Sequence, residues 1–293
     1  MRRGARAGAR VRESWMAVVT DEKQIVLSDP AAGVYQQERA AKFLATVSCE
    51  GVPNVALIVS QVPAEAGIVV FGEFMMVKTL INLESDPRVA SIAITEKLEM
   101  AGFRGEVESW TRMGEYIDLI NKIDFFRYNA YAGIHNVGVT RITSLLDVPE
   151  KVPLLKVGWE FLAIRGKSRL ARGERVSGKE VPRAIMKKFG SLYSIKVLAF
   201  TDESGAPDVL PVFASLVNPG GELRFLVSSY NKRASDIPTG STVALNVLTL
   251  DLLTYQVKGE LVRFKRSLGL LEGVVRLREA YSCVPPFCGQ RVV

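Results

Sequence analysis

The chain has 293 residues, 48% of them hydrophobic, which allows one large or two ordinary domains with buried cores. No stretch approaches the roughly 18 uninterrupted apolar residues of a membrane span, and no apolar signal-peptide core follows the basic start. We therefore expect a cytoplasmic protein without a membrane partner. A single histidine, His135, and three cysteines without a Cys-x-x-Cys pair exclude most metal centres and any convincing Ser/His/Asp set.

The net charge of +7 is concentrated at one end of the chain. The first fifteen residues carry +4, from Arg2, Arg3, Arg6, Arg10 and Arg12 against Glu13. The remainder is nearly balanced, so we do not expect a nucleic-acid partner. We predict that residues 1–15 form a disordered basic arm, or lie upstream of a true start at Met16.

The residues that commonly carry acid and base chemistry are sparse. Cys283 and Cys288 either pair near the C-terminus or remain reduced thiols, and the sequence leaves both open. Acid or base chemistry would have to come from a cofactor, carboxylates, lysine or tyrosine. No catalytic residue is nominated, and no metal site is expected.

The strongest signal is an internal repeat with a constant offset of 154 residues. The match needs no gap over about 65 positions, and roughly a quarter of the pairs are identical. Examples are Gly51 with Gly205, Pro53 with Pro207, Phe71 with Phe225, Lys78 with Lys232, and Gly105 with Gly259. Because glycine, proline and lysine stay in one register, we predict that each copy is one structural unit.

Each copy reads mainly as β-structure. The first is predicted to hold strands at residues 43–48, 54–62, 67–72, 89–95 and 100–107, and the second at 197–201, 208–216, 223–228, 243–249 and 254–262. Gly51 and Gly205 suit tight turns between the first two strands of each copy. Short strands separated by frequent turns favour a barrel or sandwich.

Helices are predicted between and after these strands. Asp29 as N-cap with Pro30 opens a helix to about Lys42, matched by residues 181–189. Shorter helices are expected at residues 78–85 and 232–236, and amphipathic helices at 117–126 and 268–277. The predicted domains are residues 16–165 and 181–293, joined by a polar linker at 166–180.

The turn before residue 78 has the character of a phosphate site. Lys78 and Thr79 stand at the mouth of a predicted helix, with Asn82 one turn on. A helix N-terminus offers free N–H groups and partial positive charge, which suits an anion. The second copy gathers similar donors at the same place: Ser228, Ser229, Asn231, Lys232 and Arg233. The alternative is that both lysines are simply solvated.

These motifs resemble those of the FMN-binding split barrels of the pyridoxamine 5'-phosphate oxidase-like superfamily. The likeness rests on Leu44-Ala45-Thr46 with Gly51 and Pro53, on Lys78-Thr79 with Asn82-Leu83, and on Gly105. In the second copy, Asn231-Lys232-Arg233-Ala234 is similar to the Ser-Arg-Lys segment that grips the FMN phosphate, with Asn231 in place of serine. The likeness covers about residues 30–145 and 180–275.

The resemblance implies two tandem split β-barrels with flanking helices, packed as an intramolecular pseudo-dimer. It implies FMN in up to two crevices between the barrels. The contacts carried over are Leu57, Ile58, Lys78, Thr79 and Asn82 in one copy, and Pro211, Val212, Ser229, Lys232 and Arg233 in the other.

The function that follows is an FMN-dependent oxidoreductase acting on a small-molecule substrate or electron partner. The alternatives are a non-enzymatic protein that binds or senses flavin, deazaflavin or haem, and a scaffold that has lost its cofactor. Haem is disfavoured because His135 is the only histidine. The sequence leaves open the substrate, the direction of electron flow, whether one or both crevices bind cofactor, and any higher homo-oligomer.

Overall fold

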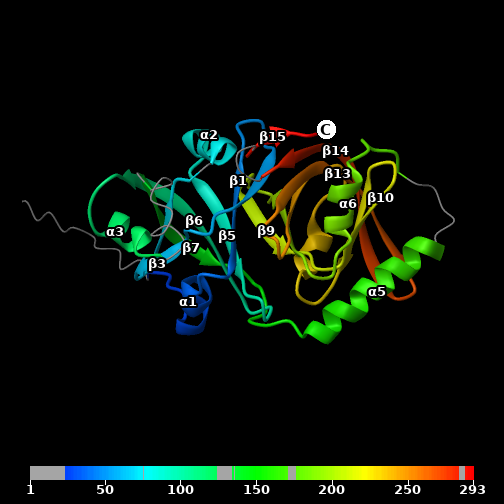
Figure 1. The fold of residues 1–293 in the computed structure, drawn as a ribbon, viewed down its shortest axis with the longest axis horizontal. Helices are drawn as coiled ribbons and strands as arrows, with labels where there is room; N and C mark the ends of the chain where they lie inside the picture. The colour runs from blue at the N-terminus through cyan, green and yellow to red at the C-terminus, as the bar shows by residue number, and fades with distance from the viewer. Residues whose placement is uncertain (1–23, 75, 124–133, 135, 171–175, 284–287) are drawn as a thin grey trace, which may run out of the picture.

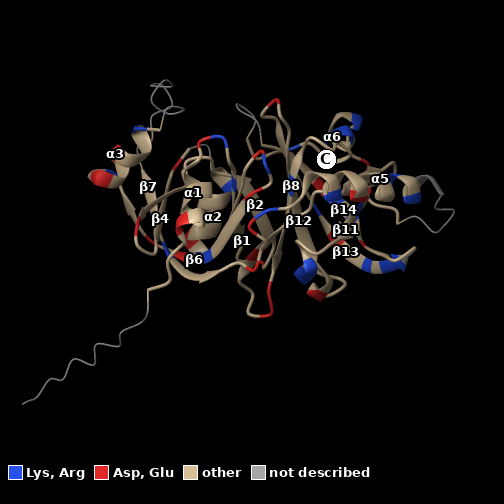
Figure 2. Ribbon diagram, turned by 90° about the horizontal axis from the view of Figure 1, so that it is seen from below, with Lys and Arg blue, Asp and Glu red and all other residues tan. Residues whose placement is uncertain are grey.

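The computed structural model describes residues 24–74, 76–123, 134, 136–170, 176–283 and 288–293 (Figure 1). The basic arm, Met16 and His135 therefore lie outside the described residues. Within the described part, no helix has the length and apolar character needed to span a membrane. Figure 2 shows basic and acidic residues on both halves of the molecule, in keeping with the near balance of charge beyond the arm.

The first unit is one antiparallel sheet in the order β2-β1-β5-β6-β7-β4-β3. Its helices are α1 (Asp29–Gln36), α2 (Val77–Ser85) and α3 (Glu115–Asn121). Its strands are β1 (Ala41–Val47), β2 (Pro53–Leu57), β3 (Val62–Glu65), β4 (Ile68–Gly72), β5 (Arg88–Ile94), β6 (Met100–Thr111) and β7 (Val137–Leu145).

The second unit follows α5 (Leu154–Leu170) and has the order β9-β8-β12-β13-β14-β11-β10, with β15 paired to β14. Its helices are α6 (Arg183–Phe189) and the 3-10 helix η2 (Lys232–Asp236). Its strands are β8 (Ile195–Thr201), β9 (Pro207–Pro211), β10 (Ser215–Asn218), β11 (Glu222–Val227), β12 (Thr242–Leu248), β13 (Thr254–Ser267), β14 (Leu270–Ser282) and β15 (Gln290–Arg291).

The two sheets have the same strand order, and the likeness extends to single backbone angles. Gly51 and Gly205 both have φ of 75°, as the turns predicted there require. Leu98 and Leu252, also at equivalent positions, have φ of 58° and 57°, a region that leucine rarely adopts. The prediction of a mainly β fold built from two tandem units is confirmed.

The units pack against each other through β1, β2, β5 and their counterparts. Every residue of β1 is buried, because one face of the strand packs in its own unit and the other faces the second unit. The shared layer includes Phe43, Ala45 and Val55 from the first unit, and Ala199 and Val209 from the second. An intramolecular pair of units is therefore held by a continuous apolar layer.

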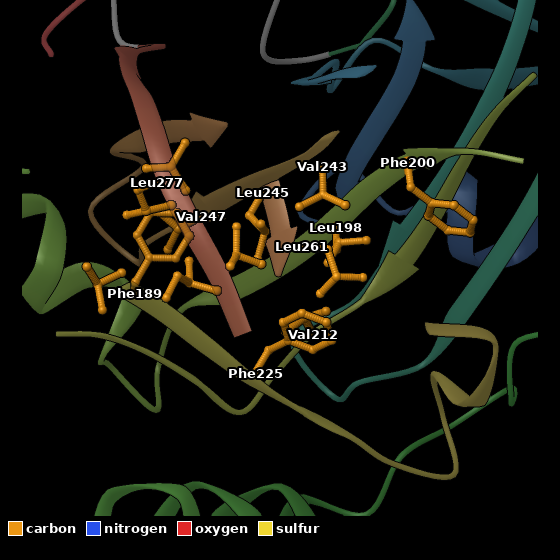
Figure 3. Packing of buried hydrophobic residues seen from close by; sticks show 14 of the residues in the cluster. Phe189, Leu198, Phe200, Val212, Phe225, Val243, Leu245, Val247, Leu261 and Leu277 are labelled. Atoms are coloured by element: carbon orange, nitrogen blue, oxygen red, sulfur yellow. The ribbon is translucent and has the colours of Figure 1, made fainter. Parts of the chain in front are cut away.

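The second unit also has a core of its own (Figure 3). Leu198, Val212, Phe225 and Leu261 are fully buried and pack in one cluster. Leu198 belongs to the same strand as Ala199, which faces the first unit. Alternation along β8 thus divides its side chains between the two apolar layers.

Two predicted helices, at 29–42 and 268–277, differ from the structure. Ser28, not Asp29, is the N-cap of α1, and the helix ends at Gln36 because β1 already begins at Ala41. Residues 268–277 form a turn and β14 instead of a helix. Val274 and Val275 are both buried, so this strand lacks the alternation that would have marked it, while Leu268 and Gly269 form a positive-φ hairpin turn.

The boundaries of other predicted elements also differ from those in the structure. The strand predicted at 54–62 is divided into β2 and the start of β3, and that at 208–216 into β9 and the start of β10. The predicted linker starts inside α5, which continues to Leu170. The N-terminal part of the helix predicted at 117–126 is present as α3, and residues 124–126 lie outside the described part.

A β-bulge recurs at the same place in both units. The pairing register shifts between Arg104 and Gly105 on β6, and between Lys258 and Gly259 on β13. A Cβ at Gly105 would lie 2.4 Å from the carbonyl oxygen of Arg141, and one at Gly259 would lie 2.3 Å from that of Arg276. Glycine is required there because backbone cannot move aside as a side-chain end can.

We predict that Gly259→Ala lowers the free energy of unfolding by about 1–3 kcal/mol, because the added methyl group overlaps a backbone carbonyl. Gly158→Ala in α5 is the matched control, since nothing lies within 4 Å of its added Cβ. That control should gain up to about 1 kcal/mol from helix propensity. Urea unfolding followed by circular dichroism measures both, and equal effects would contradict the role assigned to the bulge.

Candidate functional site

Lys78 lies between the two units. It is the second residue of α2, and its Nζ lies 3.1 Å from the ring centroid of Tyr281 on β14. Figure 1 shows α2 on the same side of the molecule as β15 and the C-terminus. The first unit therefore places a cation on an aromatic ring of the second.

A second lysine approaches the same ring. Lys258, which precedes the bulge glycine of β13, is only 8% exposed, and its Nζ lies 6.0 Å from the ring centroid of Tyr281. Among the described residues, no carboxylate lies within ion-pair distance of either ammonium group, and no hydrogen-bond acceptor is found for them. A buried ammonium group without such a partner is costly and suits an anionic ligand.

One carboxylate stands nearby and is engaged elsewhere. Glu279 accepts a hydrogen bond of 2.7 Å from Tyr281 Oη, and its other oxygen lies 3.4 Å from Arg291 Nη2. We call Lys78, Lys258, Glu279, Tyr281 and Arg291 the Lys78 cluster. Its three cations and one carboxylate leave a net positive charge.

The pKa values in the cluster reflect this excess. Burial, and to a smaller extent the charge of Lys78, lower the pKa of Lys258 to about 8, although Glu279 acts in the opposite direction. Burial also lowers the pKa of Lys78. Burial raises the pKa of the nearby Cys283 thiol to about 12, so this free cysteine is protonated near neutrality. A negatively charged ligand would stabilise the protonated form of both lysines.

The other predicted contacts of the first copy mostly bond or pack within their own unit. Thr79 accepts a hydrogen bond of 3.4 Å from Asn54 Nδ2, and Asn82 donates one of 2.9 Å to Thr46 Oγ1. Ile58 is buried in a cluster with Phe71, while the half-buried Leu57 packs against the shared layer. Of the five residues, the structure brings only Lys78 into the cluster between the units.

The predicted contacts of the second copy are dispersed. Pro211 and Val212 are buried, the latter in the core of its own unit. Ser229 is exposed and accepts a hydrogen bond from Lys156. Lys232 is exposed at the start of η2, and no described residue pairs with its side chain.

Arg233 is held by a carboxylate. Its Nη1 and Nη2 donate to the two oxygens of Asp208 at 2.6 and 3.2 Å. Arg104 of the first unit donates to the same carboxylate at 2.5 Å, and the backbone N–H of Val209 adds a bond of 2.7 Å. Asp208 is 1% exposed. We call Asp208, Arg104 and Arg233 the Asp208 cluster.

A second carboxylate engages the turn that precedes η2. Glu160 of α5 is buried and accepts hydrogen bonds of 2.5 Å from Ser228 Oγ and 2.8 Å from Tyr230 Oη. The Asn231 amide donates to the carbonyl oxygens of Pro211 and Leu226. The donors that the sequence offered as a phosphate site are thus largely satisfied within the protein.

Five residues of the two clusters and of the turn before η2 were not predicted from the sequence: Lys258, Tyr281, Asp208, Arg104 and Glu160. One signal could have revealed two of them: Arg104 and Lys258 occupy equivalent repeat positions, each directly before a shared glycine. Tyr281 lies four residues beyond the segment predicted as a helix, residues 268–277. Glu160 lies in α5, which has no counterpart in the repeat.

A cavity of about 440 Å³ lies elsewhere, between α1 and the ends of β6 and β7. Leu27, Val34, Met100 and Leu146 are among its lining residues, and none of the predicted site residues is. In the described part of the chain, no three His, Cys, Asp or Glu side chains lie close enough together to hold a metal ion.

In sequence, part of the chain is similar to a curated protein. The chain is 35% identical over 89 residues to an uncharacterized protein of Methanocaldococcus jannaschii. The aligned region covers 30% of this chain and 59% of that protein. The chain thus spans less than two thirds of that relative's length. No protein-family model matches the chain.

The chain is similar in structure to split-barrel proteins over about two fifths of its length. An FMN-binding protein from Syntrophomonas wolfei is 17% identical, matching 40% of this chain and 82% of that one with a TM-score of 0.34. An F420 reductase is 18% identical, matching 41% and 98% with a TM-score of 0.33. HutZ, the heme storage protein from Vibrio cholerae, is 16% identical, matching 42% and 94% with a TM-score of 0.31.

A buried lysine is repeated on β1 and β8. Lys42 and Lys196 occupy equivalent positions, and burial lowers their pKa values to about 8 and about 7. Lys196 Nζ donates to the carbonyl oxygens of Phe213 and Ser191 at 2.7 and 2.8 Å. Its ammonium group is thus fixed between β8 and the chain after β9.

We predict that Lys196 makes stability depend on pH. The lysine pKa is about 10.4 in an unfolded chain, so between pH 7 and 10 the unfolded state binds more protons and the free energy of unfolding rises with pH. Its share of the slope is at most about 1.4 kcal/mol per pH unit. Lys196→Met should flatten the rise between pH 7 and 9 in urea unfolding, whereas Lys97→Met, at an exposed site, should not. An unchanged slope in Lys196→Met would contradict the assigned pKa.

Proposed function

We propose that the chain binds FMN between its two units, with the phosphate at the Lys78 cluster. The observation that carries the proposal is that two lysines from different units converge on Tyr281 without a carboxylate partner. A phosphate dianion would supply the missing charge and accept from both ammonium groups. The split-barrel resemblance of the sequence motifs supports a flavin as the molecule that carries this phosphate.

We further propose that the protein is an FMN-dependent oxidoreductase acting in the cytoplasm on a small molecule or electron partner. Bound FMN would supply the electron-transfer chemistry at its isoalloxazine ring. The protein's own residues would hold the phosphate, orient the ring between the units and exclude water from it. Neither the substrate nor a catalytic residue is assigned.

The first experiment is a titration of the full chain, freed of bound flavin, with FMN and with riboflavin, which lacks the phosphate. We expect FMN to bind more tightly, because only FMN reaches the Lys78 cluster with a charged group. Equal affinity for the two flavins would contradict the phosphate site, and binding of neither would contradict the proposed function. Reduction by NADH or NADPH and reoxidation by an acceptor would then separate an enzyme from a carrier.

Lys78→Ala should weaken FMN binding by about 1.5–3 kcal/mol, roughly 10- to 150-fold, because it removes one charged hydrogen bond to phosphate. Riboflavin binding should change much less. Lys97→Ala is the control, since that exposed lysine lies in the turn at the other end of β5 from α2. Fluorescence quenching of the flavin measures the affinity of each variant for FMN and for riboflavin. An equal loss of affinity for both flavins in Lys78→Ala would place Lys78 away from the phosphate.

FMN affinity should also fall as pH rises above about 8. The pKa of Lys258 is about 8 in the free protein, and a bound anion raises it, so above this pH binding requires the uptake of a proton. Below pH 8 the lysine is already charged and affinity should level off. Lys258→Arg should retain binding and lose this dependence, because arginine stays protonated. Titrations with FMN from pH 7 to 9.5 test this prediction. The same pH profile of affinity in the wild type and in Lys258→Arg would exclude Lys258 as the source of the pH dependence.

A further inference from the structure

The two clusters occupy equivalent places in the repeat. Lys78, Thr79, Asn54 and Lys258 correspond to Lys232, Arg233, Asp208 and Arg104 at the common offset. In each case a residue at the start of α2 or η2 meets a side chain of its own second strand, Asn54 or Asp208. The basic residue before the bulge comes from the opposite unit, as the bond from Arg104 to Asp208 shows directly.

The two clusters differ in charge at one pair of equivalent positions, 54 and 208. Asn54 is neutral, whereas Asp208 is a carboxylate with 1% exposure that binds guanidinium groups from both units. An external phosphate would have to displace this carboxylate, which is covalently held at the site and therefore present at a high effective concentration. Asp208 thus occupies the position that an anionic ligand would take.

The surrounding turn strengthens the difference. Glu160 accepts from Ser228 and Tyr230, so a second internal carboxylate uses donors near η2. The positions equivalent to Ser228 and Tyr230 in the first unit are Phe74 and Met76. Their side chains carry no hydrogen-bond donor for such a carboxylate. Asp208 offsets one of the two guanidinium charges. Nε of both Arg104 and Arg233 is buried without a partner, so the two groups also keep unused donors.

We propose that the chain has a single open anion site, at the Lys78 cluster, and that Asp208 closes the equivalent site as a built-in substitute for the ligand. The identity of the anion as FMN rests on the proposed function, but closure by Asp208 does not. It follows that the chain binds one phosphorylated flavin, and that removal of the charge at position 208 opens a second site. The unused Nε donors would then face the new ligand.

The test compares binding stoichiometry in the full chain by equilibrium dialysis with FMN. The wild type should bind one equivalent, and Asp208→Asn should bind two. Because this substitution leaves two guanidinium groups facing each other, Asp208→Asn/Arg233→Thr is a second variant that copies the Asn54 and Thr79 pair of the first unit and keeps Arg104 and Lys232. Circular dichroism confirms that each variant is folded, and either variant gaining one equivalent supports the proposal.

The reciprocal variant tests the open site. Asn54→Asp should weaken the wild-type site at least about tenfold, by placing a carboxylate where the phosphate charge is needed. Two equivalents bound by the wild type, or one equivalent bound by the wild type with no gain in either folded position-208 variant, would overturn the inference while leaving the proposed function standing. No binding to the wild type but a gain in the variants would contradict the proposed function and support closure by Asp208.

Discussion

The structure depends on the burial of both faces of β1 and β8. Each strand contributes one row of side chains to its own unit and the other to the layer shared by Ala45, Val55, Ala199 and Val209. The row shared between the units is apolar, so without the opposite unit it would be exposed to water. The two units therefore form one body, and positions far apart in sequence become fixed neighbours.

That fixed packing turns ordinary surface residues into parts of a site. Lys78 would be a solvated lysine at a helix start if the first unit stood alone, and Lys258 would be a strand residue beside a bulge. In the packed pair of units both lie near Tyr281, Lys78 half-buried and Lys258 buried, and burial lowers their pKa values. The same packing brings Arg104 to Asp208, whose carboxylate offsets part of the positive charge there.

The fold could be predicted from the sequence because the repeat preserves residues with strict backbone demands, such as Gly51, Gly205 and the bulge glycines Gly105 and Gly259. The repeat could not reveal β14, whose adjacent buried valines conceal strand alternation, or α5, which belongs to neither copy. Lys78 could be nominated from its place before a helix. Its partners could not, because Lys258 and Tyr281 come from the other unit and only the packing of the units brings them near.

The covalent connection through α5 has a consequence for how the two places can differ. In a dimer of identical chains, any substitution enters both symmetry-related sites, so a carboxylate that closes one would close the other. Here positions 54 and 208 are separate codons in one chain, and asparagine at one coexists with aspartate at the other. Because the two halves are joined in one chain, equivalent positions can change independently. One half can then be specialised for a ligand while the other contributes only to the packing of the units.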